Sequence, residues 1–179
     1  MKNARLDNFK FWYKDVMIRL FADRDAGFVI LMTVFPLLER YLRQKVKLGN
    51  KAPLNDRFHD QLVNCFPELV CKDNAKNFWQ VYRNGLLHEV TLSTEDRKGK
   101  GMPTGWLSND KPSIEIELDG SFFLNPVDFA KRVLTLIEDD FSTFETTTHP
   151  SPDPLPTVEE RYPEFSSPHN HYLGTRGGK

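Results

Sequence analysis

The sequence predicts an all-α domain of about five helices, with a β-hairpin inserted before the last helix. Over most of residues 1–94, apolar side chains recur at spacings of three and four, the period of an amphipathic helix. Over residues 113–124, apolar and polar residues alternate instead, which is typical of a half-buried strand. The 179 residues suit one domain, and 14 Phe, 3 Trp and 5 Tyr supply material for a core.

Two long helices are expected first. Residues 6–22 carry apolar side chains at helical spacing: Leu6, Phe9, Trp12, Tyr13, Val16, Met17 and Leu20. Residues 25–48 are apolar nearly all round at first and amphipathic later, which indicates a central helix. Pro36 lies inside this second helix and is expected to kink or split it, and Gly49-Asn50 to end it.

Two further helices are expected before residue 94. The third should start near Asn55, with Asn55 or Asp56 as its cap. The fourth should cover residues 75–92, capped by Asp73 or Asn74. Trp79 and Tyr82 belong to the apolar set of this helix, so we expect both rings in the core.

The chain changes character after Ser93. Residues 95–112 are rich in Gly, Pro and charge, so a loop is expected there. Ile114, Ile116 and Leu118 then alternate with polar residues up to Asp119-Gly120, which predicts a hairpin over 113–124 with a two-residue type I′ turn. The last helix should start at Pro126 with Asn125 as its cap, and should extend to Phe144.

Two regions follow from this pattern: a helical domain over residues 1–148 and a tail over residues 149–179. The tail holds six of the twelve Pro and three of the five His, a composition typical of an extended or disordered segment. His169 and His171 could bind a metal, but no third ligand stands at a suitable spacing, so neither a metal site nor a cofactor is predicted.

Charge is nearly balanced, with 24 basic and 25 acidic residues and a net charge of −1, which argues against a strongly basic nucleic-acid-binding protein. Residues 40–57 are a local exception, with one acid, Asp56, among six basic residues: Arg40, Arg43, Lys45, Lys47, Lys51 and Arg57. The segment is either a solvated helix end favoured by the helix dipole or a surface that attracts phosphate. In the second case Arg40, Arg43, Lys45 and Lys47 are candidate RNA-binding residues.

Cellular location follows from what the sequence lacks. Cys65 and Cys71 are too few for a disulfide framework, no apolar run is long enough to cross a membrane, and charges near residue 1 replace the apolar core of a signal peptide. A cytoplasmic protein with reduced thiols and no membrane partner is therefore expected.

The candidate catalytic residues lie in one segment late in the expected fourth helix, Arg83-Asn84-Gly85-Leu86-Leu87-His88. At the rotation of an α-helix, Asn84 and His88 share a face and Arg83 lies on its shoulder. Gly85 is unfavourable inside a helix and indicates close approach of another backbone or a ligand. An ordinary surface arginine and a histidine near a helix end would give the same short pattern.

This segment resembles the motif of the HEPN superfamily (higher eukaryotes and prokaryotes nucleotide-binding), whose members are up-down helical bundles with an R-x(4–6)-H motif. Here the pattern is R-x4-H with the preferred Asn after the Arg, within the phrase YRNGLLHE. The resemblance covers about residues 6–145. The tail lies outside it.

The resemblance implies a metal-independent endoribonuclease and a homodimer. Two copies would meet through their motif helices, so that two Arg83/His88 sets form one composite site. The RNA 2′-OH would attack the adjacent phosphorus, with His88 moving protons and Arg83 stabilising charge. Asn84 would hold a phosphate oxygen or orient His88.

Three roles remain open at this point. The chain could be an RNase, possibly a toxin or defence effector with a cognate antitoxin, which the intact Arg83, Asn84 and His88 favour. It could be a non-catalytic dimerisation or protein-binding scaffold, which the neutral net charge favours. It could also bind nucleotides or be modified by a nucleotidyltransferase, which would be a separate protein.

Overall fold

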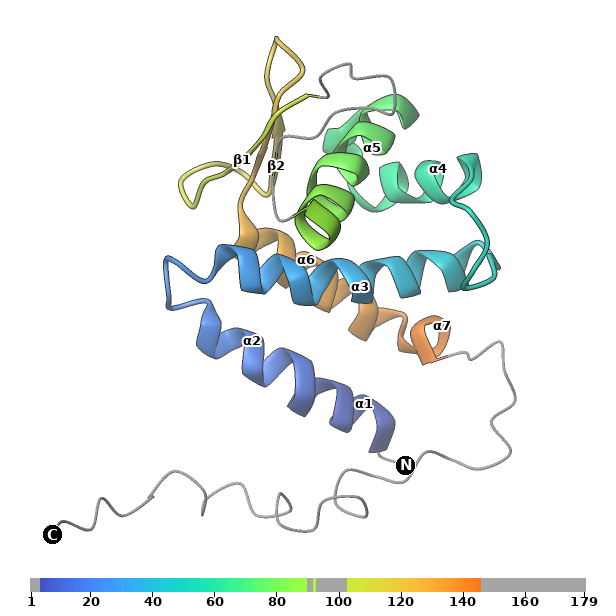
Figure 1. Cartoon of the computed structure of the whole chain (residues 1–179). Coiled ribbons are helices and arrows are strands. Elements are labelled where there is room, and N and C mark those ends of the chain that lie inside the picture. Colours follow the sequence, from blue (N-terminus) through green and yellow to red (C-terminus); the bar gives the residue numbers. More distant parts are fainter. Residues whose placement is uncertain (1–3, 90–91, 93–102, 146–179) are drawn as a thin grey trace, which may run out of the picture. The chain divides into compact units, whose positions relative to one another are not determined.

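A computed structural model of the chain describes residues 4–89, 92 and 103–145 (Figure 1). The chain divides into the units Met1–Thr146 and Thr147–Lys179. The expected tail over 149–179, including His169 and His171, lies outside the described residues. The first unit is mostly helical with a small three-stranded sheet, as the sequence predicts in outline. An up-down order of the helices is not evident.

The N-terminal helical segment consists of α1 (Ala4–Phe9), η1 (Lys10–Lys14) and α2 (Asp15–Leu20), where one helix over 6–22 is expected. The middle part, η1, is a π-helix. The buried Phe9 contacts Phe141 and Phe144 near the other end of the unit, with ring centroids 5.6 and 5.3 Å apart. Arg5 Nη1 also donates to Glu145 Oε1 at 3.0 Å, so residues 140 apart in sequence meet here.

Helix α3 (Gly27–Lys45) is the central helix and runs unbroken through Pro36 (Figure 1). Of the two outcomes expected at Pro36, a kink or a split, the split does not occur. Pro36 is exposed, whereas Leu37 and Leu38 beside it are buried. A proline on the solvent side leaves the carbonyl that lost its amide donor accessible to water, which lowers the cost of the missing bond.

Helix α4 (Asp56–Cys65) is followed by the 3-10 turn η2 (Pro67–Leu69), α5 (Lys72–Phe78) and η3 (Trp79–Glu89). Asn55 caps α4, since its side chain accepts from the Phe58 amide at 3.1 Å. Helix α5 starts one position before Asp73, so the cap predicted at Asp73 or Asn74 is wrong. Val70, with φ at 65°, and the extended Cys71 turn the chain into the helix earlier.

The sheet has the order β1-β3-β2, from β1 (Gly105–Leu107), β2 (Ile114–Ile116) and β3 (Phe122–Leu124). Strands β2 and β3 pair antiparallel, with Ile114 opposite Leu124, which confirms the hairpin. Strand β1 pairs parallel to β3 inside the expected loop over 95–112. Three residues are too few to show a strand period, so the sequence could not indicate β1.

The hairpin turn differs from the expected type. The Gly120 amide donates to the Glu117 carbonyl at 2.9 Å, and the Glu117 amide donates to the Ser121 carbonyl at 2.9 Å, so the loop has three residues. A type I′ turn needs positive φ at both central residues, but Gly120 has φ of 82° and Asp119 does not have a positive φ. Asp119 instead accepts from the Ser121 amide and hydroxyl at 2.9 and 2.6 Å.

The last helical stretch is divided into α6 (Pro126–Asp139) and α7 (Phe141–Glu145), where one helix up to Phe144 is expected. Asn125 caps α6, as predicted: its Oδ1 accepts from the Val127 and Asp128 amides, both at 3.1 Å. Its Nδ2 donates to the carbonyls of Asn109 and Lys111 at 3.0 and 3.1 Å. One buried side chain therefore joins the helix start to the loop between β1 and β2.

Asn125→Ala should lower the free energy of unfolding by about 2–3 kcal/mol, because the cap and both carbonyl contacts are lost together. Asn55→Ala is the matched control: this cap is exposed and its side chain accepts one amide hydrogen bond, so about 1 kcal/mol is expected. Urea denaturation of both variants measures the difference. Equal losses would contradict the role given to the carbonyl contacts.

An aromatic cluster fills the core where α3, α5, η3 and α6 meet. The fully buried Phe35 of α3 lies at its centre, with ring centroids 5.2–6.5 Å from those of Phe78, Trp79, Tyr82 and Phe129. Trp79 and Tyr82 are 2% and 0% exposed, which confirms that both belong to the core.

Tyr82 also ties η3 to the sheet. Its hydroxyl lies 2.9 Å from the carbonyl oxygens of Trp106 and Phe122 and accepts from the Trp106 amide at 3.2 Å. Burial raises the pKa of this hydroxyl, which keeps it protonated and able to donate. Strand β1 packs so closely that a Cβ on Gly105 would lie 2.5 Å from Val81 Cγ1. None of the helices in the described ranges has the length and apolarity needed to cross a membrane.

Candidate functional site

The motif segment lies on η3, which is a π-helix rather than the expected α-helix. In a π-helix the backbone hydrogen bonds join residues five apart. Positions 83 and 88 are five apart, which is the spacing of one such backbone hydrogen bond. One turn of a π-helix takes between four and five residues, so positions 83 and 84 both lie about one turn before position 88. The side chain of His88 lies outside the described part of the structure.

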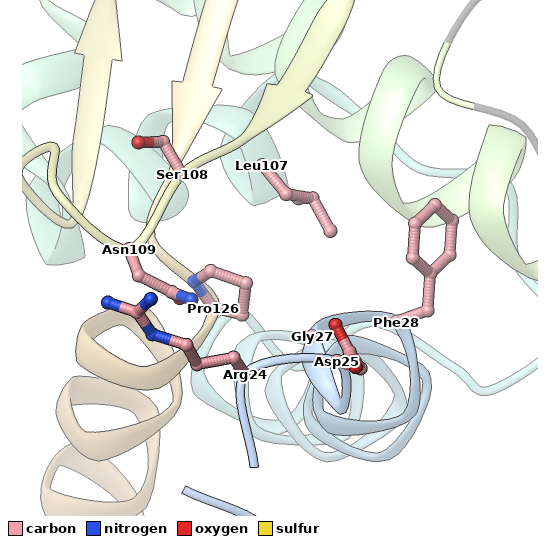
Figure 2. Close-up of a pocket in the computed structure, with 8 residues that line it drawn as sticks. All are labelled: Arg24, Asp25, Gly27, Phe28, Leu107, Ser108, Asn109 and Pro126. Carbon is pink, nitrogen blue, oxygen red and sulfur yellow. The ribbon is translucent and has the colours of Figure 1, made fainter. Parts of the chain in front are cut away.

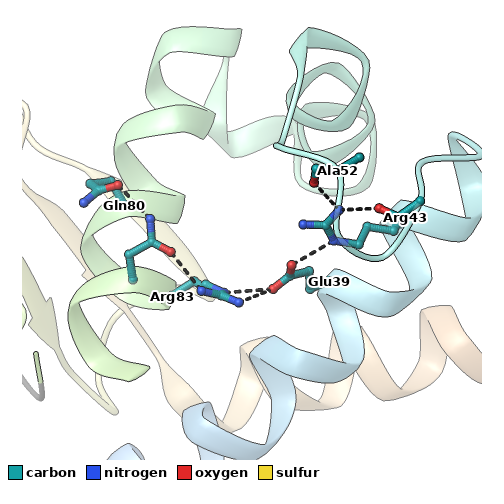
Figure 3. Close-up of polar contacts among 7 residues, drawn as sticks. Glu39, Arg43, Ala52, Gln80 and Arg83 are labelled. Carbon is teal, nitrogen blue, oxygen red and sulfur yellow. Dashed lines mark hydrogen bonds and ion pairs between the residues drawn. The ribbon is translucent and has the colours of Figure 1, made fainter. Parts of the chain in front are cut away.

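The guanidinium of Arg83 is held by Glu39, which the sequence did not single out. Glu39 Oε2 accepts from Arg83 Nε at 2.8 Å and lies 2.7 Å from Arg83 Nη2 (Figure 3). The Arg83 side chain is 23% exposed and that of Glu39 is 14% exposed. The motif arginine is thus held in a fixed orientation at a partly open surface where η3 meets α3.

Glu39 also holds a second arginine. Its Oε1 accepts from Arg43 Nε at 2.8 Å, one helical turn further along α3. Arg43 Nη1 donates in turn to the carbonyls of Gly49 and Ala52 at 3.0 and 2.8 Å (Figure 3). Two arginines with one carboxylate between them carry a net charge of +1.

Asn84 contacts Arg83 from the other side. Its Oδ1 accepts from Arg83 Nη1 at 3.1 Å, and its Nδ2 donates to Gln80 Oε1 at 2.7 Å. Asn84 therefore bridges Gln80 and Arg83 along η3.

Gly85 is buried within the chain itself. Any close approach to Gly85 therefore comes from the interior of this chain. The close approach to η3 that the structure resolves comes from Gly105 of β1, against Val81 and Tyr82.

The fold brings only part of the basic segment over residues 40–57 close to the motif. Arg43 joins it through Glu39. Arg40 Nε donates to the Phe144 carbonyl at 3.2 Å, and its guanidinium lies 4.7 Å from the centre of the Phe144 ring. Lys45 Nζ donates to Asp140 Oδ2 at 2.6 Å, and this contact lowers the pKa of the Asp140 carboxyl. Lys47 is exposed, with φ of 55°.

Two cavities lie away from the motif. One, of about 280 Å³, lies between the starts of α3 and α6 and the end of β1, and is lined by Arg24, Asp25, Gly27, Phe28, Leu107, Ser108, Asn109 and Pro126 (Figure 2). The other, of about 340 Å³, is lined by residues of α6 together with Cys65 and Phe66. Within the described residues, no three His, Cys, Asp or Glu side chains gather closely enough to hold a metal ion.

One sequence signal could have indicated Glu39. It lies four residues before Arg43, the spacing of an ion pair on one helix face, and one position before the basic segment over 40–57. Its contact with Arg83, 44 residues further on, needs the tertiary fold. No protein-family model, curated protein or solved structure matches the chain.

Proposed function

We propose that the chain is a metal-independent endoribonuclease that uses Arg83, Asn84 and His88, and that two copies form one composite site. The proposal rests on the resemblance of residues 83–88 to the HEPN motif, which would make the helical unit a HEPN-type bundle. The observation that carries it is the placement of Arg83, whose guanidinium is held by Glu39 and Asn84 at a partly exposed surface, on the same helix as His88.

The chemistry follows from the residue types. A histidine removes the proton of the RNA 2′-OH, and the 2′-oxygen attacks the adjacent phosphorus. The bond from phosphorus to the 5′-oxygen breaks, and the leaving oxygen takes a proton from an acid. The products are a 2′,3′-cyclic phosphate and a 5′-OH. Arg83 stays charged throughout and stabilises the negative charge that develops on the phosphoryl oxygens.

The purified chain should cleave single-stranded RNA in the presence of EDTA. The products should end in 2′,3′-cyclic phosphate, because a 2′-OH nucleophile leaves its own oxygen on the phosphorus. RNA with 2′-deoxy or 2′-O-methyl sugars throughout should resist cleavage. Gel electrophoresis with end analysis measures all three results, and cleavage of the 2′-O-methyl RNA would contradict the mechanism.

A second candidate is a non-catalytic scaffold that dimerises or binds another protein. One observation favours it: Arg83, Arg40, Arg43 and Lys45 all contact groups of the same chain, which reduces the positive charge they offer to a phosphate backbone. A scaffold would leave RNA intact at every protein concentration. Partner binding, for example by an antitoxin, would be unchanged in His88→Ala. A role as a toxin or defence effector is proposed only together with the endoribonuclease function.

A further inference from the structure

The carboxylate of Glu39 occupies the centre of a continuous chain of polar contacts (Figure 3). The chain begins at the carbonyls of Gly49 and Ala52, passes through Arg43 and Glu39 to Arg83, and ends at Asn84 and Gln80. It connects the loop after α3 to η3. Every contact in it is 3.1 Å or shorter, so the loop and the motif arginine belong to one connected set of contacts.

We propose that Glu39 is a positioning residue for Arg83, which sets the orientation in which the guanidinium meets a phosphate of the RNA substrate. This inference rests on the endoribonuclease function proposed above. Arginine has a long side chain with about 2 kcal/mol of rotamer entropy, so an unsupported guanidinium spends much of its time misaligned. A carboxylate oxygen that contacts both Nε and Nη2 fixes the plane of the group before substrate arrives.

The second arginine, Arg43, keeps a net positive charge at the site despite the carboxylate of Glu39. A carboxylate paired with Arg83 alone would cancel its charge and weaken its attraction for phosphate. Arg43 shares the same carboxylate through Oε1, so the three groups together retain a charge of +1. Arg43 is 11% exposed and also held by two backbone carbonyls, which keeps Glu39 in place.

Glu39→Gln tests the inference. An amide has one accepting oxygen, and its NH2 end would face one of the two arginines, so it cannot bridge both. We expect kcat for RNA cleavage to fall about 10–100-fold, the size of effect that follows from a misplaced catalytic group, with KM changed by less than about threefold.

Glu138→Gln is the matched control. The Glu138 side chain is 16% exposed, contacts Lys14 at 2.8 Å and Lys10 at 3.9 Å, and lies on α6. Glu138 is as buried as Glu39 and also pairs with two cations, but these cations belong to the N-terminal helical segment and not to the motif. Its kcat should remain within about twofold of wild type, and both variants should show similar losses in thermal stability.

A double-mutant cycle separates positioning from a general effect on the fold. If Glu39 acts through Arg83, Glu39→Gln should cause no further loss in an Arg83→Ala background. An equal loss in both backgrounds, or a Glu39→Gln protein as active as Glu138→Gln, overturns the inference while the proposed function stands. A wild type that cleaves no RNA overturns the proposed function, and the inference with it.

A second variant covers the case in which Glu39→Gln does not fold. Arg43→Lys keeps the charge of the cluster but removes the planar group that contacts Glu39 and both carbonyls. We expect kcat to fall about 3–10-fold, again without a change when Arg83 is already alanine. Wild-type activity in folded Arg43→Lys and in folded Glu39→Asp would overturn the inference.

Discussion

Arg83→Ala and His88→Ala should each lower the rate of RNA cleavage by about 10²–10⁴-fold. Loss of a general acid or base costs about this much, and loss of a charge-stabilising donor costs about 10²–10³-fold. Both variants should remain folded: Arg83 is partly exposed, and its truncation leaves no large cavity in the core. Single-turnover cleavage, with circular dichroism to check folding, measures the effect. Asn84→Ala should be milder, because an amide supports the geometry without moving a proton.

Arg132→Ala is the matched control for Arg83→Ala. Arg132 also pairs with a glutamate, Glu68, but lies on α6 beside the second cavity. Its removal should leave cleavage unchanged. The composite site adds a second check: a mixture of Arg83→Ala and His88→Ala proteins should regain part of the activity, because a mixed dimer retains one arginine and one histidine. Cleavage by His88→Ala at the wild-type rate would contradict the site.

Phe35→Ala should lower the free energy of unfolding by about 3–5 kcal/mol, a large part of the roughly 5–15 kcal/mol typical of a domain. Phe35 is fully buried, and four aromatic rings on three other elements contact it, so a cavity would open at the junction of α3, α5, η3 and α6. Urea denaturation measures the loss, and any RNase activity should be lost with the fold.

Val29→Ala serves as the comparison on the same helix. Val29 is 52% exposed, so its truncation should cost at most about 0.5 kcal/mol. A similar loss for Phe35→Ala and Val29→Ala would contradict the central place given to the aromatic cluster.

Local signals in the sequence predict much of this fold. The sequence predicts Asn125 as one cap and Asn55 or Asp56 as another, because an asparagine or aspartate before a helix satisfies its first amides; the structure has Asn125 and Asn55. The burial of Trp79 and Tyr82 followed from apolar spacing alone. Strand β1 and the break at Asp140 could not be predicted, since both depend on partners far away in sequence.

The candidate site is likewise predicted from the sequence only in part. The short motif indicated Arg83, Asn84 and His88, which are consecutive or nearly so along the chain. The structure places them on a π-helix, and no residue pattern in Trp79–Glu89 indicates one. Glu39 was missed because its contact with Arg83 spans 44 positions.

The contact between Arg5 and Glu145 has a consequence for synthesis on the ribosome. These residues are separated by 140 positions, and Phe9 likewise packs against two residues that are made much later, Phe141 and Phe144. At about 5–20 residues per second, the N-terminal helical segment is synthesised roughly 7–28 seconds before its partners. During this time Phe9 lacks the rings of Phe141 and Phe144, and the nascent chain exposes an apolar side chain that a chaperone can bind.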